Sequence, residues 1–165
     1  MTELSDSRRQ KDEFFKFSPQ SPIPPGERRH FEGLAYFDAN PDLSFSLEVE
    51  PADGAEIVVQ TSDGVERTYR RAGTVEFEVN GAPVRLTLYD TGGHAWFLPF
   101  RDATSGSSTY GAGRYLDLHD EGGGKVTLDF NLAYHPFCAY NDAYSCPLPP
   151  HENWLQVSIE AGERL

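Results

Sequence analysis

The sequence predicts an all-β fold, a single-domain antiparallel barrel or barrel-like sandwich of about nine or ten strands with a short N-terminal helix. Three observations indicate this fold class. Apolar and polar residues alternate with a period of two after residue 33, turn dipeptides separate the alternating segments, and helix signals are confined to residues 1–32. The length suits one domain over residues 1–165, with a helix and proline-rich strap in 1–32 and an antiparallel β domain in 33–165.

Three segments show the strand alternation most clearly: LSFSLEVE (43–50), TVEFEV (74–79) and VRLTLY (84–89). Each places apolar side chains on one face, as half-buried strands do. Asp63-Gly64 and Asn80-Gly81 lie between alternating segments, where such dipeptides supply the positive φ of tight hairpin turns. They predict two hairpins. Further strands are expected over residues 33–37, 94–100, 114–118, 125–130 and 154–160.

The N-terminal residues predict one short helix and a connector. Ser7 and Gln10 have the spacing of a capping box, and Pro19 stops the helix from continuing. The segment SPQSPIPP (18–25) predicts an extended strap across the sheet, followed by one further helical turn before Gly33.

The net charge of −12, from 26 acidic and 14 basic residues, opposes binding to nucleic acid or to an anionic membrane. The charged N-terminal residues do not resemble a secretory signal, and no stretch approaches the ~20 apolar residues of a membrane span. We therefore expect a cytoplasmic protein. Because lysines are few and carboxylates many, the composition fits either a halophilic protein or an acidic protein in ordinary salt.

Two stretches depart from the alternating pattern, and such departures often mark functional regions. The first, FLPFRDATSGSSTYGAGRYLD (97–117), combines Arg101 and Arg114 with glycines and hydroxyl side chains. Glycine-rich backbone and guanidinium groups bind carboxylate or phosphate well. The segment matches neither a P-loop nor a dinucleotide fingerprint. It predicts either an anion-binding loop or an ordinary loop whose arginines pair with Asp102 and Asp117.

The second stretch, residues 129–155, is long, aromatic and rich in proline. Cys138 and Cys146 lie eight positions apart, between His135 and His151, in the order H-x2-C-x7-C-x4-H. Four such side chains can form a tetrahedral zinc site, but this spacing is not a tight zinc-binding form. A reduced thiol pair and a disulfide are the simpler alternatives, and we expect no metal and no cofactor.

Residues 14–37, 97–117 and 126–163 include the runs SPQSPIPP, TYGAGRYLD and CPLPPHEN. Through these segments the chain resembles, over nearly its whole length, an uncharacterised family, domain of unknown function number 1684. The family name implies no activity. His135 stands where the family more usually has asparagine, which argues against a zinc role. The positions that the resemblance carries over are Arg101, Asp102, Tyr110, Gly111, Gly113, Arg114, Asp129, Asn131, Tyr134, Cys138, Cys146, Glu152 and Asn153.

From strand alternation we expect polar side chains of both irregular stretches to converge at one mouth of the barrel, beneath the 134–154 loop. Such a cleft would accept a small anionic ligand and make the chain a small-ligand binding protein without nucleic-acid or membrane partners. The predicted ligand-binding residues are Arg101, Tyr110, Gly111, Gly113, Arg114, Asp129, Asn131 and Tyr134.

Two other functions remain open on the sequence. One is an enzyme of unknown reaction, in which Cys138 or Cys146 serves as nucleophile with His135 or His151 as base. The other is a structural or protein-interaction module, in which a buried network of arginine, aspartate and asparagine fastens the long loop to the sheet.

Overall fold

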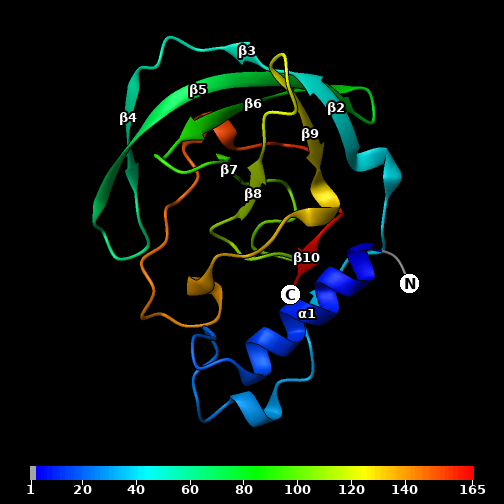
Figure 1. The fold of residues 1–165 in the computed structure, drawn as a ribbon, viewed down its shortest axis with the longest axis vertical. Helices are drawn as coiled ribbons and strands as arrows, with labels where there is room; N and C mark the ends of the chain where they lie inside the picture. The colour runs from blue at the N-terminus through cyan, green and yellow to red at the C-terminus, as the bar shows by residue number, and fades with distance from the viewer. Residues whose placement is uncertain (1–2) are drawn as a thin grey trace.

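The structure, a computed structural model, describes residues 3–165 and contains one α-helix, ten strands and five 3-10 helices in that range (Figure 1). The α-helix is α1 (Glu3–Phe17). The strands are β1 (Ala35–Tyr36), β2 (Ser44–Glu48), β3 (Glu50–Pro51), β4 (Glu56–Gln60), β5 (Glu66–Val79), β6 (Ala82–Asp90), β7 (Trp96–Phe100), β8 (Arg114–Leu118), β9 (Lys125–Asp129) and β10 (Glu163–Arg164). The 3-10 helices are η1 (Arg28–His30), η2 (Pro41–Leu43), η3 (Phe130–Leu132), η4 (Phe137–Ala139) and η5 (His151–Asn153).

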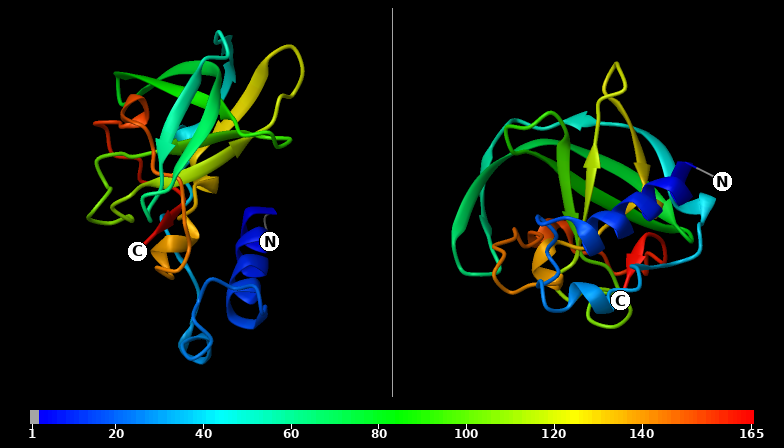
Figure 2. Two further views of the ribbon diagram at one scale, coloured as in Figure 1. Left: turned by 90° about the vertical axis from the view of Figure 1, so that its left-hand side faces the viewer. Right: turned by 60° about the horizontal axis from the view of Figure 1, so that its bottom comes forward.

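All strand pairs are antiparallel, and they form one large sheet and two small ones. The six-stranded sheet runs β3-β5-β6-β7-β8, with β4 also paired to β5, while β2 pairs with β9 and β1 with β10. The all-β prediction is confirmed. The sheet is not closed into a barrel, so a loose barrel-like sandwich describes it better; β5 and β6 curve over the other strands (Figures 1 and 2).

The main core lies between the six-stranded sheet and the β2–β9 pair, and phenylalanines fill its centre. Phe45 of β2 packs against Phe77 of β5 with ring centroids 4.6 Å apart. Phe130, just after β9, meets Phe100 of β7 at 5.3 Å and Phe77 at 5.8 Å. Since aromatic pairs add to the free energy gained by burying apolar area, these contacts join the two layers.

Both predicted hairpins are confirmed. Asn80 and Gly81 have φ values of 51° and 81°, and they join β5 to β6 directly, with Val79 opposite Ala82. This double positive φ is the signature of a two-residue hairpin turn. Gly64, with φ 85°, turns the chain between β4 and β5.

The strand predicted over residues 154–160 is wrong. This segment instead runs beside the loop after β7, where Arg101 and Trp154 form an isolated parallel bridge and the Ala103 N–H donates to the Val157 carbonyl at 2.9 Å. Because the neighbouring chain turns at residues 103–104, residues 154–160 have no continuous strand with which to form a ladder of backbone hydrogen bonds. The strand predicted over residues 33–37 shortens to β1.

The N-terminal helix is present but its predicted start is wrong. Since α1 begins at Glu3, Ser7 lies inside the helix and does not cap it. Residues 18–25 form successive turns rather than an extended strap, and η1 supplies the expected further turn. Phe15, the buried residue of α1, packs on Phe31, Phe137 and Tyr140, so the helix covers the long C-terminal loop and not the open face of the sheet. Within residues 3–165 no helix is long and apolar enough to cross a bilayer.

Asn153 of η5 completes the sheet where its backbone pairing fails. The ladder between β6 and β7 contains the single register pair Tyr89 and Phe97. The Asn153 side chain, 0% exposed, accepts from the Thr87 N–H at 2.8 Å and donates to the carbonyls of Thr87 and Pro99, both at 2.9 Å. One amide therefore replaces missing strand-to-strand hydrogen bonds.

Candidate functional site

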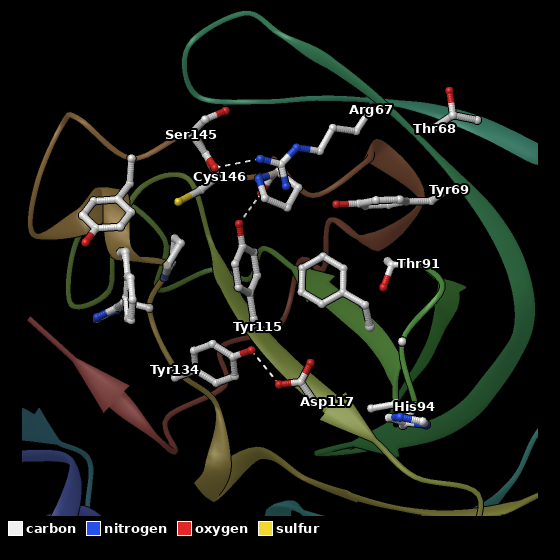
Figure 3. Close-up of a pocket in the computed structure, with 18 residues that line it drawn as sticks. Arg67, Thr68, Tyr69, Thr91, His94, Tyr115, Asp117, Tyr134, Ser145 and Cys146 are labelled. Atoms are coloured by element: carbon white, nitrogen blue, oxygen red, sulfur yellow. Dashed lines mark hydrogen bonds between the residues drawn. The ribbon is translucent and has the colours of Figure 1, made fainter. Parts of the chain in front are cut away.

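An open cleft of about 900 Å³ lies between the outer face of the sheet at β5, β7 and β8 and the segment 134–147 (Figure 3). Six of its eighteen lining residues are phenylalanine or tyrosine, with polar side chains between them. The lining residues are Arg67, Thr68, Tyr69, Thr91, Gly93, His94, Ala95, Phe97, Tyr115, Asp117, Tyr134, His135, Pro136, Phe137, Tyr144, Ser145, Cys146 and Pro147. A concave, largely apolar site with a few convergent polar groups is the usual form of a small-molecule site.

Strand alternation builds the sheet side of the cleft. On β8, Arg114 and Leu116 face the interior, whereas Tyr115 and Asp117 project into the cleft. Phe97 of β7 is the cross-strand partner of Asp117, and its ring packs edge-on against Tyr115 with centroids 4.7 Å apart. The predicted alternation on β8 is therefore confirmed, but the cleft lies on the face opposite Arg114.

Two tyrosine hydroxyls tie the loop side of the cleft to the sheet side. Tyr134 donates to Asp117 Oδ2 at 2.6 Å, and Tyr115 donates to the Pro147 carbonyl (Figure 3). Tyr115 and Tyr134 also form an isolated backbone bridge. Burial raises the pKa of both phenols, and the Asp117 carboxylate raises that of Tyr134 further, so both keep their protons at neutral pH. The cleft walls are thus held in place by direct contacts.

Charged groups mark two ends of the cleft. In Figure 3, Arg67 and Asp117 lie at opposite ends with Tyr115 between them. One Arg67 nitrogen donates to the Ser145 carbonyl at 3.0 Å, and the side chain is exposed. Arg67 is therefore the arginine that can meet an acidic ligand group in this cleft.

The predicted convergence at one mouth is wrong, and Arg114 shows why. Its side chain is 1% exposed and donates to the carbonyls of Ala161 at 2.5 Å, Ile159 at 2.9 Å and Glu163 at 3.0 Å. Asp102 lies 3.7 Å away and is equally buried. Burial lowers the pKa of Arg114, while the Asp102 carboxylate opposes that shift. Facing the core, Arg114 holds the C-terminal segment and cannot reach a solvent-open cleft.

Arg101 and the predicted loop glycines also serve the fold. The Arg101 guanidinium lies over the Trp154 ring, 4.4 Å from its centroid. Gly113 has φ 105°, and a Cβ there would come within 2.4 Å of the Phe100 carbonyl, so this position allows β7, β8 and Pro149 to approach closely. Gly111 is exposed in the turn before β8.

Asp129 caps η3, and Asn131 within η3 holds a neighbouring loop. Asp129 Oδ1 accepts from the Asn131 N–H at 3.0 Å and from its side-chain amide at 2.8 Å. That amide also exchanges two hydrogen bonds with the Asn40 backbone, at 2.8 and 2.9 Å. Of the eight predicted ligand-binding residues, Tyr134 is the one that lines the aromatic cleft.

Tyr110 lies beside His135, a buried histidine at the edge of the cleft. The Tyr110 N–H donates to His135 Nε2 at 3.3 Å, so that nitrogen carries no proton. Burial, with the positive charges of Arg114 and Lys11, lowers the pKa of His135 to about 3, and the imidazole is neutral at physiological pH. Burial and a hydrogen bond with Cys138 raise the pKa of Tyr110 to about 12.

The two thiols lie close together, and that of Cys146 is not activated. Both are free and buried, and the Cys138 N–H donates to Cys146 Sγ at 3.3 Å. Burial raises the pKa of the Cys146 thiol to about 11, which leaves little thiolate at neutral pH. His151 stacks on Trp154 at 3.7 Å, and within residues 3–165 no group of three or more His, Cys, Asp or Glu side chains is placed to hold a metal ion. The geometry gives no support to the zinc site or to the cysteine nucleophile.

Sequence reasoning missed most of the cleft. The strands that carry Arg67, Tyr69 and Phe97 show a visible alternation. The aromatic residues on the side away from the apolar core, however, look like ordinary strand residues in the sequence. An available signal was the recurrence of aromatic residues on the face opposite the apolar core of β5, β7 and β8. Tyr69, Tyr89 and Val59 form a second small buried cluster there, which shows that this face is also packed.

Comparisons with known proteins place the chain in a family. The model of the family described as "Protein of unknown function (DUF1684)" matches residues 29–164. The chain belongs to this family, as the resemblance implied.

It is also similar to an uncharacterized protein of Haloarcula marismortui whose structure was solved in solution by NMR. The two are 43% identical, the match covers 98% of this chain and 92% of that chain, and the TM-score is 0.75. No curated protein matches the chain.

Proposed function

We propose that this chain is a small-ligand binding protein and that its ligand occupies the aromatic cleft between β5, β7, β8 and the segment 134–147. The observation that carries the proposal is the cleft's composition: at least five aromatic side chains around about 900 Å³, with Arg67 and Asp117 at its ends. Such walls favour a ligand with a flat or apolar body. The anionic group expected of the ligand would meet Arg67, because Arg114 is sealed in the core.

The structural alternative explains a different part of the molecule. Arg114, Asp102 and Asn153 are buried, each is hydrogen-bonded to backbone groups, and none of them lines the cleft. Their network fastens residues 153–163 to the sheet. A scaffold of this kind and a ligand cleft on its outer face are compatible, and the proposal assigns the two roles to separate residues.

A thermal-shift screen with small organic acids, amines and aromatic metabolites tests the proposal. Ala95, half-buried at the cleft, is replaced by tryptophan to fill the space without touching the core. The matched control is Val58→Trp, an exposed β4 position 55% accessible to solvent. Compounds that stabilise wild type and Val58→Trp but not Ala95→Trp support the cleft. Equal shifts in all three proteins, or no stabilising compound, contradict it.

A cytoplasmic location is likewise our proposal. Cys138 and Cys146 are free and buried, and the Cys138 N–H donates to Cys146 Sγ. Two neighbouring thiols that stay reduced fit a reducing compartment, where disulfides are rare. Fractionation of the producing cells tests it, and recovery of the chain outside the cytoplasm would contradict it.

A further inference from the structure

From the charges and rings at its two ends, we infer that the cleft is built for a zwitterion: a ligand whose cationic ammonium group sits at Asp117 while its acidic group meets Arg67. This inference rests on the proposed function and specifies the ligand class for the same site.

Asp117 presents a carboxylate to the cleft. Its Oδ2 accepts from Tyr134, and its other oxygen points away from Tyr134 (Figure 3). Asp117 is exposed, so its carboxylate is reachable from solvent. Because the Tyr134 hydrogen bond fixes its orientation, Asp117 offers one preoriented acceptor at the end of the cleft.

Three aromatic residues are neighbours of this carboxylate. Phe97 is its cross-strand partner, Tyr115 lies two residues before it on the same face of β8, and Tyr134 touches it directly. An ammonium group bonded to Asp117 would therefore stand next to aromatic rings, whose negative faces attract cations. A carboxylate with neighbouring rings is the recurring chemistry of ammonium recognition.

The balance of charge in the cleft selects a zwitterion over a simple cation. Arg67 and Asp117 are the arginine and the carboxylate of its lining, which also holds two histidines, the exposed His94 and the buried, neutral His135. A ligand with only an ammonium group would leave Arg67 without a partner across the cleft, and a ligand with only a carboxylate would face Asp117. In addition, the protein's net charge of −12 attracts cationic groups to its surface, which favours binding of the ligand's ammonium group.

The test uses four probes that share one ring: 4-(2-aminoethyl)benzoate, phenethylamine, 4-ethylbenzoate and the neutral 4-ethylbenzamide. Their dissociation constants are measured by NMR titration of the ¹⁵N-labelled protein at neutral pH. We expect the zwitterion to bind most tightly, by about tenfold over the neutral probe. Backbone signals of β7 and β8 should shift.

Matched variants assign the two ends. Asp117→Asn removes the charge and keeps an oxygen to accept from Tyr134, so it should weaken the zwitterion and phenethylamine about tenfold and leave 4-ethylbenzoate unaffected or tighter. Arg67→Gln should weaken the zwitterion and 4-ethylbenzoate and leave phenethylamine unaffected or tighter. Glu78→Gln removes one exposed negative charge elsewhere on β5 and should change nothing.

The outcomes separate this inference from the proposed function. If the benzamide and benzoate shift cleft signals but phenethylamine and the zwitterion show no preference and no response to Asp117→Asn, the cleft binds ligands and the zwitterion inference is wrong. If none of the four probes perturbs the cleft, both are contradicted.

Discussion

The guanidinium of Arg114 and the carboxylate of Asp102 meet in the interior, 3.7 Å apart, with both side chains 1% exposed. Asp102 also accepts from the Ile159 N–H at 2.6 Å and from Thr104 Oγ1, so the pair holds the loop after β7, the start of β8 and the C-terminal segment together. Arg114, which the sequence places in a ligand site, therefore stabilises the fold instead. The ligand cleft that we propose lies on the other face of the same strand.

Replacing Arg114 with methionine should lower the free energy of unfolding by about 3–5 kcal/mol, because Asp102 would remain buried without its cation. Denaturant unfolding measures this. The double variant with Asp102→Asn should recover part of the loss, and Arg101→Met, which removes only a stacking contact on Trp154, should cost less than about 1 kcal/mol. Wild-type stability in Arg114→Met, accompanied by lost ligand binding, would show that this arginine belongs to a binding site after all.

Asn153→Ala should destabilise the protein by about 2–4 kcal/mol, since it leaves the buried Thr87 N–H and two carbonyls without partners. The matched control is Asn141→Ala, whose side chain makes an exposed hydrogen bond to the Ala143 N–H and should cost less than about 1 kcal/mol. Chemical denaturation of both variants decides the matter. Equal small losses would mean that β6 and β7 hold together without this amide.

His135 should make the stability depend on pH below neutrality. Its pKa is about 3 in the folded chain against 6.5 in the unfolded chain, so between these values the unfolded chain binds the extra proton. The contribution is complete above pH 6.5 and is lost as the pH falls toward 3, at up to about 1.4 kcal/mol per pH unit. Subtracting the curve of His135→Gln isolates this site from the carboxylates. A difference curve that is flat from pH 6 down to 4 would contradict the buried neutral imidazole.

The acidic composition predicts stabilisation by salt. Screening reduces the mutual repulsion expected from a net charge of −12, so the thermal midpoint should rise as KCl increases from about 0.1 to about 2 M. Differential scanning calorimetry at fixed pH measures it. A midpoint that stays constant or falls would favour the reading of an acidic protein adapted to ordinary salt.

The sequence predicts this fold better than its site for a physical reason. Strand alternation and the Asn80-Gly81 turn are local signals, and the β4–β5 and β5–β6 hairpins that follow from them are correct. Closure of the sheet depends on long-range packing, which no local signal reports. Residues 154–160 alternate as a strand would, yet they lack a straight neighbour to pair with.

The same limit applies to the site. Alternation places Tyr115 and Asp117 together, opposite Arg114, but it does not say which face meets the core. Because arginine is rarely fully buried, the sequence favours placing Arg114 on the solvent-facing side of β8, whereas it faces the core. Three backbone carbonyls from residues 159–163 accept hydrogen bonds from the buried Arg114 guanidinium and so offset the cost of burying it. They come from a segment 45 or more positions away in the chain.

The measurement that bears most directly on the ligand cleft is a crystal structure of the protein soaked with 4-(2-aminoethyl)benzoate. The account predicts density for the flat compound against Tyr115 and Phe97, with its ammonium group on Asp117 and its carboxylate on Arg67. Density at other surfaces alone, or an empty cleft at saturating concentrations of this probe and its three relatives, would contradict it.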